Sequence, residues 1–145
     1  MQGRPWLARR VFAAAQDPVS GFPFMVQMIS LTARALQALR LGALTPLCNA
    51  RAAEAEAEAA AAAPGPVLRA FDDFYAGLAL AFVEKWRESG ATIARMGHIM
   101  LEVGGEAHRA PERCVASMLA AQAKAECDER RAAGAGAAEV SFSRF

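Results

Sequence analysis

Residues 68–86 read LRAFDDFYAGLALAFVEKW. The large apolar residues in this segment follow one another at steps of three and four: Leu68, Phe71, Tyr75, Leu78, Phe82 and Trp86. An α-helix turns once every 3.6 residues, so this spacing places all six side chains along one side of a helix. We call these six residues the aromatic stripe. The stripe predicts a long helix whose apolar side either packs inside the protein or binds an external surface or partner.

The composition predicts a helical protein. Alanine makes up about a quarter of the 145 residues, well above its usual share. The β-branched residues are scattered and form no alternating run, so no strand is expected. Because alanine favours helix but buries little apolar area, the helices need to pack on one another or on another surface. The predicted fold is all-α: an antiparallel helical bundle or hairpin of amphipathic helices with one long helix.

Prolines, glycines and changes in periodicity divide the chain into three parts. Residues 1–16 are rich in arginine and contain no acid, which predicts a short basic amphipathic helix. Residues 17–133 are expected to form the helical domain. Residues 134–145 lack periodicity and predict a flexible tail.

Four helices are expected within the domain. The first spans residues 24–41, and the alanine- and glutamate-rich residues 47–63 predict a second, exposed helix. The long helix starts near Val67 and is expected to continue past Ser89-Gly90 to Val103, because apolar residues there resume the spacing of three and four. The last helix is expected from Pro111 to about Ala133.

Charge, hydropathy and cysteine usage exclude several classes of protein. The formal net charge of +1 argues against a nucleic-acid partner. No run of about 18 apolar residues occurs, so no transmembrane segment is predicted. The three cysteines form no CxxC pair, which favours free thiols and a cytoplasmic location.

The sequence contains no recognisable catalytic machinery. The phosphate-binding, dinucleotide-binding, zinc-protease and serine-hydrolase motifs are all absent. The four soft metal-ligand candidates lack the short paired spacing of a zinc site: His98, His108, Cys114 and Cys127. Asp72 and Asp73 are adjacent, and adjacent helical residues point about 100° apart. We therefore expect no catalytic residue, no metal ion and no cofactor.

The chain resembles phasins, proteins that coat polyhydroxyalkanoate storage granules in bacteria. The resemblance covers residues 18–130 approximately. It rests on the helix over 24–41, on Asn49-Ala50-Arg51 leading into the alanine and glutamate run, and on Lys85-Trp86-Arg87 in the long helix. The break at Pro64-Gly65-Pro66 and the three cysteines depart from a simple coat protein.

The resemblance implies a non-enzymatic coat that adsorbs to a hydrophobic polymer or lipid-like surface, forms homo-oligomers and sits at storage granules in the cytoplasm. Two alternatives remain open. One is a helical adaptor or homo-oligomeric bundle that binds a protein partner through the aromatic stripe. The other is a small enzyme or redox sensor built on Cys114 and His108, since the dipole at the start of the last helix lowers the pKa of a nearby thiol.

Overall fold

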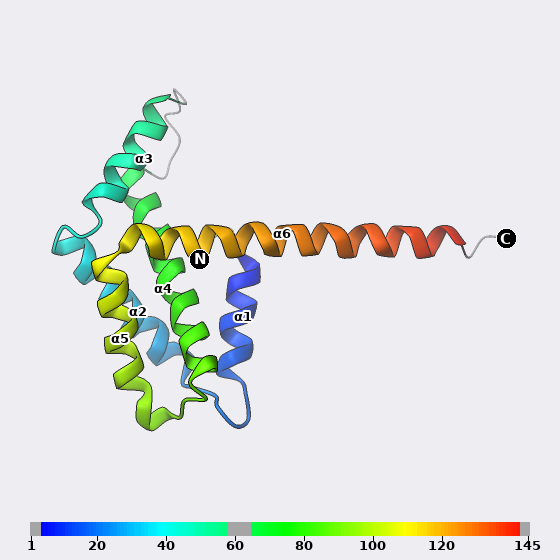
Figure 1. The fold of residues 1–145 in the computed structure, drawn as a ribbon, viewed down its shortest axis with the longest axis horizontal. Coiled ribbons are helices and arrows are strands. Elements are labelled where there is room, and N and C mark those ends of the chain that lie inside the picture. Colours follow the sequence, from blue (N-terminus) through cyan, green and yellow to red (C-terminus); the bar gives the residue numbers. More distant parts are fainter. Residues whose placement is uncertain (1–3, 58–64, 143–145) are drawn as a thin grey trace.

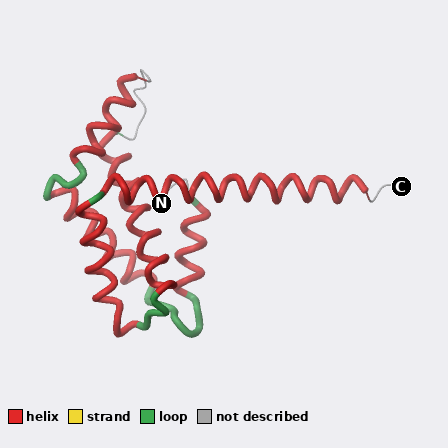
Figure 2. Tube along the Cα trace, viewed as in Figure 1, coloured by secondary structure: helices red, strands yellow, loops and turns green. Residues whose placement is uncertain are grey.

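The computed structural model describes residues 4–57 and 65–142. In these residues the chain forms α-helices and one short 3-10 helix, without strands (Figures 1 and 2). The elements are α1 (Pro5–Ala15), α2 (Phe24–Arg40), α3 (Thr45–Ala57), α4 (Pro66–Glu88), η1 (Ile93–Arg95), α5 (Met96–Arg109) and α6 (Pro111–Phe142). The predicted all-α class is confirmed. None of the described helices is both long enough and apolar enough to cross a membrane.

Helix α4 is the centre of the fold, and each of the other α-helices packs against it (Figure 1). Its buried side chains include Phe74, Leu78, Phe82 and Trp86, which share one core with residues from the surrounding helices. The N-terminal helix α1 belongs to this core, because Leu7 and Val11 are fully buried. Helix α6 crosses α4 near its own N-terminus and then extends far beyond the body of the protein (Figure 1).

The expected continuous helix through Ser89-Gly90 is wrong. Helix α4 ends at Glu88, and Gly90 adopts a φ of +55°, which an L side chain rarely takes. The amide of Gly90 donates to the carbonyl of Arg87 (3.2 Å) and that of Ala91 to the carbonyl of Trp86 (3.3 Å), a typical glycine-terminated helix end. The chain then turns back, so the apolar residues of α5 pack beside α4 instead of extending it (Figure 1).

The two C-terminal helices are longer than expected. Helix α5 continues through Gly104-Gly105 to Arg109, and α6 continues past Ala133 to Phe142, into the predicted flexible tail. In α6 the alanine-rich sequence favours helix strongly enough to carry the chain through Gly134 and Gly136. Residues 58–63 of the expected alanine and glutamate helix, and residues 143–145 of the expected tail, lie outside the described residues.

Candidate interaction surface

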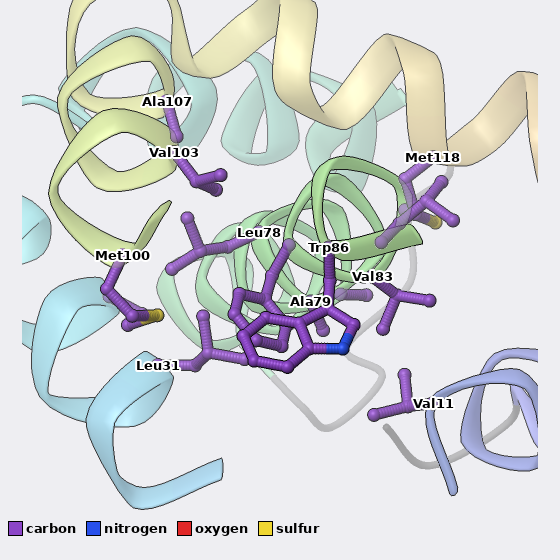
Figure 3. Packing of buried hydrophobic residues seen from close by; sticks show 14 of the residues in the cluster. Val11, Leu31, Leu78, Ala79, Val83, Trp86, Met100, Val103, Ala107 and Met118 are labelled. Carbon is purple, nitrogen blue, oxygen red and sulfur yellow. The ribbon is translucent and has the colours of Figure 1, made fainter. Parts of the chain in front are cut away.

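The structure separates the aromatic stripe into two parts. Leu78, Phe82 and Trp86 are at most 1% exposed and lie in the core. Figure 3 shows Leu78 and Trp86 between Leu31 and Met100 on one side and Val11 on the other. Phe71 and Tyr75 are half-buried, whereas Leu68 is 58% exposed. The C-terminal part of the stripe therefore packs inside the protein, which was one of the two alternatives that the sequence left open.

A loop between α1 and α2 covers the C-terminal part of the stripe. The ring of Phe22 packs edge-on against Phe82 and Trp86, with centroid distances of 5.2 and 5.3 Å. The indole nitrogen of Trp86 donates a hydrogen bond to the carbonyl of Ser20 (2.5 Å). Gly21 is required here, since a Cβ would lie 2.5 Å from the Asp17 carbonyl oxygen. The glycine and prolines at 18–23 indicated a turn, but no sequence signal showed that Phe22 enters the core.

Asp17 holds this loop in its turn. Its Oδ1 accepts hydrogen bonds from the amides of Ser20 (2.7 Å) and Val19 (2.9 Å) and from the Ser20 hydroxyl (3.1 Å). These hydrogen bonds, with the Ser20 amide contributing most, lower the pKa of the Asp17 carboxyl below its usual value. Asp17 thus orients the segment that covers Trp86.

The N-terminal part of the stripe borders an open apolar groove of about 440 Å³ between α2 and the start of α4. We call it the apolar groove and define it by Leu36, Leu39, Gly65, Pro66, Val67, Leu68 and Phe71. Val67 and Leu68 are both more than half exposed in the folded domain. No charged side chain lines the groove. It is suited to apolar contact and has no group for catalysis.

Helix α2 extends this apolar surface. Its inner face packs on α4 through Leu31, Ala35 and Ala38. On its outer side Met25, Ile29 and Leu36, which we call the outer row, are 67%, 66% and 46% exposed. Their spacing of four and seven places them on one side of the helix. Helix α2 is therefore apolar on two sides. The apolar spacing is visible in the sequence, but no binding role was predicted for the outer side of the helix.

Ion pairs fix the N-terminal part of α4 on its other side. Asp73 is 9% exposed and pairs with Arg4, the N-cap residue of α1, and with Arg51 of α3, the latter at 2.6 Å. Arg4 also reaches Asp72 (2.6 Å), so one guanidinium spans the two adjacent carboxylates. The pKa of Arg51 is raised, first by its hydrogen bond to Glu54 and then by the charge of Asp73. This network connects α1, α3 and α4.

Cys114 lies where α6 crosses α4, against Gly77. Burial raises the pKa of its thiol to about 11, the opposite of the lowering that the helix dipole predicted. Desolvation outweighs the dipole at this position, so the thiol stays protonated at neutral pH. Across residues 4–57 and 65–142, no three His, Cys, Asp or Glu side chains gather closely enough to hold a metal ion.

The fold and its surface define a small helical domain arranged around one central helix. Residues 2–100 match the family model of the ELMO/CED-12 family. The match covers more than half of the chain, so this protein belongs to the ELMO/CED-12 family.

Two similar proteins are ELMO domain-containing protein 3 from Mus musculus and from Homo sapiens. Each is 25% identical over 112 residues, which cover 77% of this chain and 26% of the relative. The Bos taurus protein of the same name is 24% identical over 112 residues. The chain thus spans about a quarter of the length of these relatives. No solved structure matches the chain.

The family assignment overturns the resemblance to phasins. The storage-granule coat, and a hydrophobic polymer as its target, were therefore wrong. The resemblance rested on alanine content and helix layout, which follow from helix propensity and are shared by unrelated helical proteins. Of the readings that the sequence left open, the helical adaptor agrees better with the family.

Proposed function

We propose that this domain is a non-enzymatic protein-interaction module, an adaptor that binds a partner protein through the apolar groove and the outer row. The observation that carries the proposal is the row of exposed apolar side chains on an already folded domain. Met25, Ile29, Leu36 and Leu68 remain exposed although the core beneath them is filled.

The size of the surface agrees with reversible binding. Contiguous apolar patches beyond a few hundred Å² are rare on monomeric proteins and mark interaction sites. Covering an apolar patch of the size usual for such sites, roughly 400 Å², contributes about 10 kcal/mol at about 25 cal/mol per Å². Association costs about 4–15 kcal/mol in lost freedom. The apolar surface therefore gives moderate affinity, and polar contacts around it select the partner.

Membership of the ELMO/CED-12 family supports this proposal. The curated relatives are much longer chains, in which the matched region is one part of a larger protein. A helical domain carried in larger proteins is a common form for an interaction module. The proposal keeps only Leu68 and Phe71 of the aromatic stripe as binding residues, because the C-terminal part of the stripe is core. Self-association of the chain remains a prediction.

The experiment compares two matched double variants in host cells. Leu36→Asp/Leu68→Asp changes two leucines at the groove that are 46% and 58% exposed. Leu101→Asp/Leu119→Asp changes two leucines elsewhere that are 62% and 42% exposed. A photo-crosslinking residue in place of Val67 identifies proteins seated at the groove. Binding of the purified crosslinked protein is then measured by calorimetry.

We expect the groove variant to lose the crosslink and at least tenfold in affinity, and the control variant to keep both. Circular dichroism and urea denaturation check that both variants fold. The proposal is contradicted if no protein crosslinks at Val67, or if the two variants bind the purified protein equally well.

A further inference from the structure

The shape of the apolar groove matches a helix. Helices α2 and α4 run antiparallel: Phe22, just before α2, contacts Trp86, whereas Leu36 and Leu39 near the end of α2 line the groove with Leu68. Two packed helices leave a groove between them into which a third helix fits with ridges in grooves. The outer row covers 11 residue steps of α2, about 16 Å, so a partner helix of three to four turns spans it.

The charged residues of α2, which forms one wall of the groove, are of one sign. No Asp or Glu occurs in residues 18–53, so α2 carries only arginines as charged residues. Arg40 is exposed in the last turn of α2, one residue beyond groove residue Leu39, and among the described residues it has no carboxylate partner. The groove therefore offers a partner an unpaired guanidinium beside its apolar walls.

The start of α4 adds positive potential at the same end of the groove. Gly65 is the N-cap residue of this 23-residue helix and provides no side-chain hydrogen bond, and the first turn contains no acid. Gly65, Pro66 and Val67 all line the groove. The positive end of the helix dipole favours an anionic group at this position. Arg40 and the positive end of α4 both favour a carboxylate group in the molecule that occupies the groove.

We propose that the apolar groove binds an amphipathic α-helix of a partner protein, and that this helix carries a carboxylate side chain at the end that meets Arg40 and the start of α4. This inference rests on the proposed function and specifies the chemistry of the partner. Apolar side chains at steps of three and four fill the groove and cover the outer row. The acidic residue sets the direction in which the helix lies.

Two other occupants fit less well. A second copy of this chain joined through the same surface would place two acid-free helices against each other, with no carboxylate for either Arg40. A lipid bilayer is flat, so the concave wall formed by Leu39 and Phe71 would lose contact with it.

The test uses a displayed library of peptides of about 18 residues, five turns of helix. Apolar positions are fixed at helical spacing, and the flanking positions at both ends vary among Glu, Gln and Lys. The full chain is the bait. We expect Glu to be enriched at one end only. Arg40→Glu should reverse this preference towards Lys and weaken binding of the Glu peptide about fivefold.

The variants distinguish the inference from the proposed function. Leu36→Asp/Leu68→Asp should abolish enrichment, and Leu101→Asp/Leu119→Asp should keep it. Peptides that depend on the groove but show no acidic preference, or a preference that Arg40→Glu leaves unchanged, would overturn the inference and leave the proposed function standing. If the groove variant enriches the peptides as strongly as the unchanged protein does, both the inference and the proposed function would be overturned. Groove-dependent dimerisation in sedimentation, or groove-dependent binding to neutral or anionic vesicles without peptide enrichment, would also overturn the inference.

Discussion

The two ends of α4 carry the same apolar spacing but have opposite environments. At the C-terminal end Phe82 and Trp86 are enclosed by α1, α2 and the loop that contains Phe22. At the N-terminal end Leu68 and Phe71 face the apolar groove, and Leu68 is 58% exposed. The spacing of three and four thus defines a side of a helix, whereas chain segments far away in sequence determine whether that side becomes core or surface.

The comparison also extends to the polar side of α4. Its N-terminal part is fixed to α1 and α3 by the pairs of Asp73 with Arg4 and Arg51. Its C-terminal part carries more exposed pairs, Glu84 with Arg10 (3.2 Å) and Lys85 with Glu102 (2.6 Å). On its apolar side it is held by aromatic packing and by the hydrogen bond from Trp86 to Ser20. Because ion pairs already hold the N-terminal end in place, its apolar side remains available for a partner.

The largest effect is expected from Trp86→Ala. Removing a fully buried indole leaves a cavity and an unpaired Ser20 carbonyl, which should lower the free energy of unfolding by about 3–5 kcal/mol. The matched change at the other end, Leu68→Ala, should stay within about 0.5 kcal/mol because that side chain is mostly exposed. Urea denaturation measures both. Similar losses for the two variants would contradict the division of α4 into core and surface ends.

Gly77→Ala tests the close packing at the middle of α4. A Cβ on Gly77 would lie 2.7 Å from the Cys114 carbonyl oxygen, so α6 has to shift, and we expect a loss of about 2–3 kcal/mol. Gly105→Ala is the control, since nothing lies within 4 Å of its Cβ position inside α5. That change should stabilise the protein by about 0.5–1 kcal/mol through helix propensity. Thermal unfolding that ranks the two variants in the opposite order would refute this packing.

Asp73→Asn tests the ion pairs at the N-terminal end. The substitution removes the charge that two arginines share, but Arg4 keeps Asp72 and Arg51 keeps Glu54. We therefore expect a loss of about 1–2 kcal/mol, less than for a fully buried pair. Glu129→Gln breaks the exposed Arg9 pair, whose side chains are 67% and 60% exposed, and should cost less than about 0.5 kcal/mol. Equal denaturation midpoints for these two variants would show that the network contributes nothing to stability.

Residue spacing and proline positions were enough to predict the helical class, the starts of α2, α4 and α6, and the side of α4 that carries the stripe. The end of α4 could not, because Ile93 to Val103 continue the helical spacing whether the chain runs straight or turns back at Gly90. The outer row of α2 was visible as spacing, but its exposure depends on which side α4 covers. Burial of Trp86 depends on Phe22, 64 positions earlier in the chain. Composition and helix layout together suggested the wrong family.

The smallest effect concerns the loop that covers the C-terminal end of α4, and it depends on pH. The pKa of Asp17 is lowered in the folded protein below its ordinary value of 3.8, chiefly by the Ser20 amide. A lowered pKa means that the ionised carboxylate stabilises the folded state at pH values above about 4, and that this contribution is lost as the pH falls through the folded-state pKa. Asp17→Asn should therefore lower the urea midpoint slightly at pH 7, and the difference between the two proteins should shrink as the pH falls through the folded-state pKa. Comparing the two proteins at each pH cancels the titration of other groups, so a pH-independent difference would show that the carboxylate charge does not hold the loop over Trp86.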